Sequence, residues 1–135
     1  MPYSIYKSFS FCYGHRLFGD KGKCGHLHGH SAKVEIKIRG AKLDELGMVE
    51  NFDKLKSKIG AWIEQNLDHK MILNKKDPLA VILKKEGEPC FLLDTNPTAE
   101  NLARLLYDIA QDIGFNVVKV KFWESETSKA SYKPR

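Results

Sequence analysis

Three of the five histidines in the chain are spaced as ligands of one metal ion would be. His28 and His30 are separated by one glycine, and alternate residues of a β-strand point to the same face of a sheet. His15 ends an earlier segment whose apolar residues alternate in the same way. Three covered imidazoles need partners for their ring nitrogens, and three histidines are typical of a zinc site with one open position. We therefore predict a catalytic Zn²⁺ site made by His15, His28 and His30.

Cys24 leaves a second interpretation of this site open. Cys24 and His26 share the even-numbered phase of the two strand histidines, so spacing alone also allows a closed, structural Cys-His-His-His site. Glycines on both sides of Cys24 favour a turn that breaks the phase, and flanking lysines favour a reactive thiolate. The role of His26 stays open.

Two other acidic positions are candidates for chemistry. Asp68 directly precedes His69, and a neighbouring carboxylate can orient an imidazole for proton transfer; an ordinary surface dipeptide is the alternative. Glu124 continues the apolar phase of Val118, Val120 and Phe122, which points its carboxylate towards the covered face. Such a carboxylate needs a pair of donors, which the edge of an amino-pyrimidine ring supplies; an exposed strand end is the alternative.

The elements that hold these residues follow from hydrophobic periodicity. Alternation predicts strands over residues 3–13 and 32–39, each with one covered face. Helical spacing predicts a helix over 52–66 that Asn51 caps, and a second helix that starts at Asn96-Pro97 and ends at Gly114. Cys90 to Leu93 and Val117 to Phe122 are predicted strands, and Asp77-Pro78 can start a short helix. This order (strand, strand, helix, helix, strand, strand) indicates an α+β fold with an antiparallel four-stranded sheet and two helices on one face.

Length and composition narrow the class of protein. The 135 residues are expected to form one domain, 1–135, and 42% hydrophobic residues suffice for a core. No apolar run approaches the length of a membrane helix, no secretory signal is seen, and three irregularly spaced cysteines suit a reducing cytoplasm. The net charge of +5 fits either a solvated lysine-rich surface or attraction of a polyanion such as a triphosphate or nucleic acid. A chain this small is expected to gain burial as a homo-oligomer.

Six ordered blocks of sequence together resemble the 6-pyruvoyltetrahydropterin synthase family, over nearly the whole chain. They are FCYGHRL, CGHLHGH, GMVENFDKLK, LDHKMIL, NPTAEN and WESETSKASY. The resemblance implies the tunnelling fold, in which the sheets of several subunits close into a barrel. It also implies a homohexamer, a dimer of trimers, whose active sites lie between subunits.

The resemblance also implies a role for each candidate residue. The three histidines would bind zinc, Cys24 would be the catalytic thiolate, and Asp68 with His69 would be its proton-transfer partner. Glu124 would anchor the pterin ring, with Thr98 and Glu100 helping to hold it. The substrate would be a dihydropterin triphosphate.

Departures from the family pattern are few. Tyr13 and Gly14 stand where the family often has two small residues, and Tyr13 could narrow the pocket. Asn51 replaces an aspartate of many bacterial relatives, and both residue types cap helices. Cys24 is kept, which argues against relatives that carry glutamate there.

The spacing between Cys24 and the HGH run separates two branches of the family. Three residues lie between them, as in bacterial-type members that make 6-carboxytetrahydropterin for queuosine biosynthesis. We therefore expect a zinc-dependent lyase of that branch, with a 6-pyruvoyl synthase or a paralogue with altered substrate as alternatives. An alternative of another class is a non-catalytic zinc module that binds nucleic acid, but paired C-x-x-C knuckles and an arginine-rich helix are missing.

Overall fold

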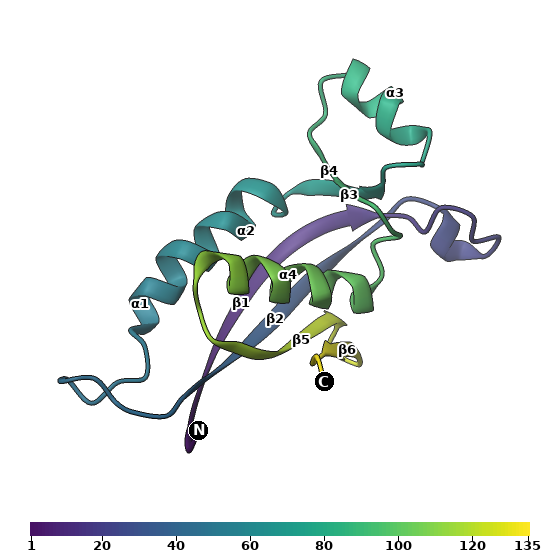
Figure 1. Ribbon diagram of the computed structural model, residues 1–135. Coiled ribbons are helices and arrows are strands. Elements are labelled where there is room, and N and C mark those ends of the chain that lie inside the picture. Colours follow the sequence, from purple (N-terminus) through teal and green to yellow (C-terminus); the bar gives the residue numbers. More distant parts are fainter.

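The computed structural model describes residues 1–135 as one mixed sheet with helices packed against it (Figure 1). The strands lie in the order β4-β3-β1-β2-β5-β6. Their bounds are β1 Tyr3–His15, β2 His28–Gly40, β3 Lys70–Asn74, β4 Cys90–Leu93, β5 Val117–Ser125 and β6 Ser128–Tyr132. The helices are α1 Phe52–Leu55, α2 Ala61–Asn66, α3 Leu79–Lys85 and α4 Ala99–Ile113, with a 3₁₀ turn η1 at Lys23–Gly25 and a π-helical turn η2 at Lys56–Gly60 that joins α1 to α2. None of these helices combines the length and the apolar character that a membrane crossing requires.

The antiparallel hairpin of β1 and β2 is the centre of the sheet. Its register runs from Tyr3 opposite Gly40 to His15 opposite His28. Phe11 and Tyr13 on β1, and Val34 and Ile36 on β2, are buried on the covered face. The alternation predicted for both strands is therefore confirmed.

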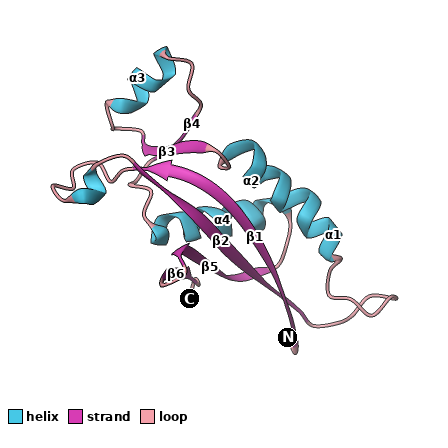
Figure 2. Ribbon diagram, turned by 180° about the vertical axis from the view of Figure 1, so that it is seen from behind, coloured by secondary structure: helices cyan, strands magenta, loops and turns pink.

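α1, α2 and α4 form one layer over that face, whereas α3 stands apart from them beside β3 and β4 (Figure 1). α4 lies in front of β1 and β2 in Figure 1, and the strands lie in front of α4 in the view from behind (Figure 2). Its buried side chains meet those of α1, η2 and α2 above the sheet. The residues of this core with no exposed surface are Val34, Ile36, Leu55, Ile59, Leu67, Ile72, Leu102, Ala103, Leu106, Ala110, Val120 and Phe122.

The α+β class is confirmed, but the prediction of four antiparallel strands is wrong. The sheet has six strands, and β3 pairs in parallel both with the end of β1 and with β4. β3 was missed because its apolar residues, Met71 to Leu73, run continuously and carry no alternation. β6 carries few apolar residues and forms by pairing with β5.

Two further details of the predicted elements need correction. Thr98, not Asn96, caps α4, because the Asn96 side chain instead binds the backbone of Phe18 in the loop after β1. A register shift between Lys37 and Ile38 places Val117, not Val118, in the core. The caps predicted at Asn51 and Gly114 are confirmed, and Gly114 has the positive φ of 119° that favours glycine.

A partly buried ion pair connects the end of β1 to the start of α3. Arg16 donates two hydrogen bonds to Asp77, at 2.7 Å from Nε and 2.5 Å from a terminal nitrogen. The Asp77 side chain is fully buried and also accepts from the backbone N–H of Leu79. The arginine holds the pKa of Asp77 below its usual value, against the opposing effect of burial. This pair fixes the chain immediately after His15.

Candidate metal centre

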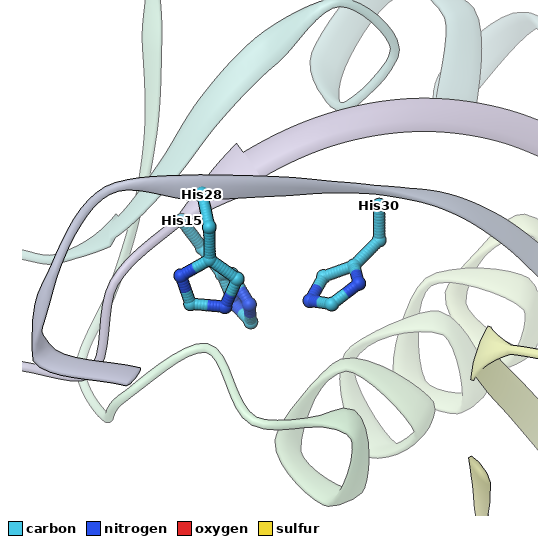
Figure 3. A group of neighbouring side chains, drawn as sticks. All are labelled: His15, His28 and His30. Carbon is cyan, nitrogen blue, oxygen red and sulfur yellow. The ribbon is translucent and has the colours of Figure 1, made fainter. Parts of the chain in front are cut away.

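Three imidazoles converge at one end of the covered face (Figure 3). His15 ends β1, His28 begins β2 directly opposite it, and His30 follows on the same face of β2. The ring centroids of His15 and His28 are 4.6 Å apart, and each lies 5.0 Å from that of His30. One nitrogen from each ring lies within 4.8 Å of the other two. The predicted convergence of these histidines is therefore present in one chain.

Two backbone carbonyls decide which nitrogen faces the shared space. The Nδ1 of His15 lies 2.8 Å from the carbonyl oxygen of Pro97, and the Nδ1 of His28 lies 2.7 Å from that of His26. A carbonyl can only accept, so each Nδ1 carries the proton and each Nε2 keeps its lone pair. Such carbonyl partners commonly orient histidines that ligate metals.

The free nitrogens fit a bound cation. The Nε2 atoms of His15 and His30 are buried and have no hydrogen-bond partner. Burial lowers the pKa of His15, and the neighbouring His28 and His30 act in the same direction, against the Pro97 carbonyl and Glu124. Neutral imidazole is the form that binds a metal, and an all-imidazole set of three suits zinc. These residues therefore fit the ion that the sequence predicts.

Cys24 lies outside this cluster. It sits in the exposed 3₁₀ turn η1, where its carbonyl oxygen accepts from the N–H of Leu17 at 2.8 Å. The turn interrupts the strand before His28, so the even-numbered phase that Cys24 shares with the histidines does not bring them together. The cluster of candidate ligands contains the three histidines alone, which disfavours the closed Cys-His-His-His arrangement.

Asp68 and His69 form a hydrogen-bonded pair on the side of β1 that faces away from the three histidines. The Nδ1 of His69 lies 3.0 Å from Asp68 Oδ1, and Asp68 also accepts from the N–H of Cys12 at 3.0 Å. Burial opposes the ionisation of Asp68, but these hydrogen bonds outweigh it and lower the pKa of Asp68. The backbone N–H of His69 bonds the Cys12 carbonyl at 2.7 Å and its φ is 59°, which is uncommon for a residue other than glycine.

This pair does not meet the metal centre within one chain. The Cys12 side chain beside it points to the face opposite His15 and Tyr13. His69 is 79% exposed and lines a cavity of about 370 Å³ with Cys12, Met71 and Glu88, and that cavity contains none of the three clustered histidines.

Glu124 borders the metal centre, while Thr98 and Glu100 lie beside it at the start of α4. Glu124 Oε1 lies 3.6 Å from His30 Nε2. Glu100 and Glu124 line one cavity of about 430 Å³ between α4 and the β5–β6 turn. The hydroxyl of Thr98 accepts from the N–H of Asn101 at 3.1 Å, so it already serves as the helix cap.

Tyr13 and Pro97 are the residues of the centre that sequence reasoning left without a defined role. The centroid of the Tyr13 ring lies 5.0 Å from that of His15 and 5.7 Å from that of His30. Burial raises the pKa of the Tyr13 hydroxyl well above its usual value, and the negative charge of Glu124 raises it further. Tyr13 alternates in phase with His15 on β1, and this alternation could have predicted that its ring lies beside the histidines. The contact of Pro97 is made by its backbone carbonyl, so the pattern of side chains could not have predicted it.

Comparison with known proteins agrees with this geometry. The family model described as 6-pyruvoyl tetrahydropterin synthase matches residues 4–135. A "6-carboxy-5,6,7,8-tetrahydropterin synthase" of Rickettsia bellii is 35% identical over 126 residues, covering 88% of this chain and 91% of the relative. A protein of Aquifex aeolicus with the same name is 34% identical and covers 98% and 99% of the two chains.

Solved structures show the same fold. An uncharacterised protein of Wolinella succinogenes superposes with a TM-score of 0.80 at 27% identity, covering 98% of both chains. The 6-pyruvoyl tetrahydropterin synthase of Caenorhabditis elegans superposes with a TM-score of 0.74 at 25% identity, covering 98% of this chain and 96% of that one. The sheet with a helical layer on its covered face is thus the tunnelling fold. In sequence and in fold, the chain belongs to the 6-pyruvoyl tetrahydropterin synthase family.

Proposed function

We propose that this protein is a zinc-dependent 6-carboxy-5,6,7,8-tetrahydropterin synthase. It would convert 7,8-dihydroneopterin triphosphate and water to 6-carboxytetrahydropterin, acetaldehyde and triphosphate, in the cytoplasm and for queuosine biosynthesis. The observation that carries the proposal is the convergence of three imidazoles, one nitrogen of each within 4.8 Å of the other two, with the Nε2 atoms of His15 and His30 buried and unpaired. The names of the relatives and the three-residue spacing between Cys24 and His28 support the 6-carboxy branch.

The metal would be held by His15, His28 and His30. When bound, zinc supplies Lewis-acid chemistry, which polarises hydroxyl oxygens and acidifies the C–H bonds beside them. The carbonyls of Pro97 and His26 keep two of these rings in the orientation that presents Nε2. The protein's own contribution at this point is rigid placement of the ligand set.

Cys24 and His69 would move the protons. The Cys24 thiolate takes a proton from one face of the substrate side chain, and His69 exchanges a proton on the other face. Asp68 accepts the Nδ1–H of His69, which leaves the Nε2 of His69 free for that exchange. Such shifts isomerise the side chain, expel triphosphate and reduce the ring without an external hydride donor. Addition of water and cleavage of a carbon–carbon bond of the side chain would then leave the carboxyl group on the ring and release acetaldehyde.

Glu124 would hold the pterin ring. Its carboxylate can accept two hydrogen bonds from the amino-pyrimidine edge, which orients the side chain towards the three histidines. Glu100 lines the same cavity and would contact the ring beside it, and Thr98 would help by fixing the start of α4. The net charge of +5 favours capture of the triphosphate.

A complete site would need more than one subunit. Asp68 and His69 lie across β1 from the metal centre, so a neighbouring copy would supply them. This arrangement fits a homohexamer built as a dimer of trimers, in which the sheets of three subunits close into a barrel.

The decisive experiment is incubation of the zinc-loaded protein with 7,8-dihydroneopterin triphosphate, followed by mass spectrometry. We expect 6-carboxytetrahydropterin together with acetaldehyde. A 6-pyruvoyl product would assign the protein to the other branch. Absence of any product, with zinc bound, would overturn the proposal in favour of a paralogue that acts on another substrate.

A further inference from the structure

The hydroxyl of Tyr13 is a buried group that the proposed chemistry leaves unused. Tyr13 is only 4% exposed, and its hydroxyl has no hydrogen-bond partner. The buried side-chain atoms without a partner are this hydroxyl and the Nε2 atoms of His15 and His30. A buried hydroxyl is costly to leave unpaired, so unpaired groups gathered at one place indicate a missing ligand.

The position of the Tyr13 ring ties it to the metal centre. Tyr13 stands directly opposite His30 in the β1–β2 register, and its ring meets that of His15 edge to face. The ring centroid also lies 5.9 Å from that of Phe122 on β5, so the ring reaches across β2. With Phe11 and Phe122 as its other aromatic neighbours, the ring separates the histidines from the apolar core.

We propose that Tyr13 is a specificity-determining residue of this centre, whose hydroxyl donates a hydrogen bond to a side-chain oxygen of the bound ligand. This inference rests on the proposed function. The phenol supplies an O–H donor to this space, whereas the Nε2 of His15 carries a lone pair because its Nδ1 faces the Pro97 carbonyl. The Nε2 of His30 would offer its lone pair as a ligand of the metal. The Nε2 lone pairs of the histidines can bind a cation, and the Tyr13 O–H can donate to an oxygen atom. Together these groups favour a ligand that carries a hydroxyl oxygen next to the metal. The ring closes the core side of the pocket and limits the ligand side chain there.

The test compares two probes that differ in that oxygen. Biopterin carries a dihydroxypropyl side chain, and 6-methylpterin has the same ring without hydroxyls. Equilibrium binding of both to the zinc-loaded protein is measured by fluorescence, for the wild-type chain and for Tyr13→Phe. Tyr6→Phe is the matched control, since Tyr6 lies on the same strand but is exposed on the opposite face.

We expect Tyr13→Phe to weaken the binding of biopterin about tenfold and to leave that of 6-methylpterin unchanged. The Tm of the metal-free variant should equal or exceed that of the wild type, because the lost hydroxyl had no protein partner. Equal loss for both probes, or no loss for biopterin, would overturn the role of Tyr13 alone. A metal-free Tm several degrees lower would also overturn it and show a structural role. Failure of the wild-type protein to bind either pterin would overturn the proposed function together with this inference.

Discussion

The imidazole of His15 on β1 is held from across the core by the carbonyl of Pro97, 2.8 Å from its Nδ1. Pro97 immediately precedes the cap of α4, so the helical layer and the sheet jointly orient this ring. The contact directs Nε2 into the space shared with His28 and His30, where a metal ion would find two of its ligands already unpaired.

Removal of one imidazole should therefore weaken metal binding strongly. We expect His30→Ala to weaken zinc affinity by more than about a hundredfold, since even outer partners of metal ligands are worth roughly 10- to 100-fold. His26→Ala is the matched control, because only the backbone carbonyl of His26 contacts the cluster. Metal content after dialysis, by mass spectrometry, checks both variants. Equal zinc in His30→Ala and wild type would refute the three-histidine site.

Cys24 should be needed for turnover and not for the metal. Cys24→Ala is expected to keep its zinc while the rate falls at least about 100-fold, the usual scale for loss of a proton-transfer group. Cys90→Ala should leave the zinc content and the rate unchanged, because Cys90 belongs neither to the histidine cluster nor to the lining of the His69 cavity. Loss of zinc from Cys24→Ala would instead favour a closed site with sulfur as the fourth ligand.

Glu124 should anchor the pterin ring. Glu124→Gln keeps the size of the side chain but loses one acceptor position and the charge, so pterin affinity should fall about tenfold or more with unchanged zinc content. Glu126→Gln, on the opposite side of the same strand end, is the control. Pterin titration followed by fluorescence checks the effect, and unaltered affinity in Glu124→Gln removes this residue from the site.

A site shared between subunits can be tested by mixing two inactive variants. Cys24→Ala and His69→Ala, refolded together in equal amounts, should recover about a quarter of the wild-type activity if each site takes Cys24 from one subunit and His69 from another. Each variant refolded alone is the control. No recovery, with mixed oligomers verified by mass spectrometry, would place both groups in one chain.

The Arg16–Asp77 pair predicts a pH-dependent stability. Because Arg16 lowers the pKa of Asp77, the pair stabilises the folded state fully above the ordinary carboxyl pKa of 3.8, and this stability is lost as the pH falls through the lower folded value. Asp77→Asn should cost about 3 kcal/mol at pH 7, since it leaves a partly buried charge unpaired. The difference in unfolding free energy between the wild type and Asp77→Asn should decrease as the pH approaches 3.

Urea unfolding between pH 7 and pH 3 measures this effect. Asp94→Asn is a suitable control, because Asp94 pairs with Lys75 on the surface and that pair is screened by solvent. Equal stability of Asp77→Asn and wild type at neutral pH would show that the buried pair is not stabilising.

Local periodicity was enough to predict which face of the sheet each ligand occupies. The two-residue period of β1 and β2 put His15 in phase with Phe11, and His28 and His30 in phase with Val34, all on the face that the structure buries. The caps at Asn51 and Gly114 were equally local, because each is satisfied within a few residues of chain.

Contacts between distant segments were decided only by the tertiary structure. Four such contacts join residues more than 50 positions apart. They are the pairing of β3 with the end of β1, the hydrogen bond between His15 and the Pro97 carbonyl, the hydrogen bonds between Asn96 and Phe18, and the Arg16–Asp77 ion pair. Such contacts leave no periodic trace in the chain, because they depend on which elements pack together and not on neighbouring residue types. The sequence alone therefore predicted the candidate ligand set and placed it on one face, whereas packing decided how the rings are oriented and that Asp68 and His69 stand on the far side of β1.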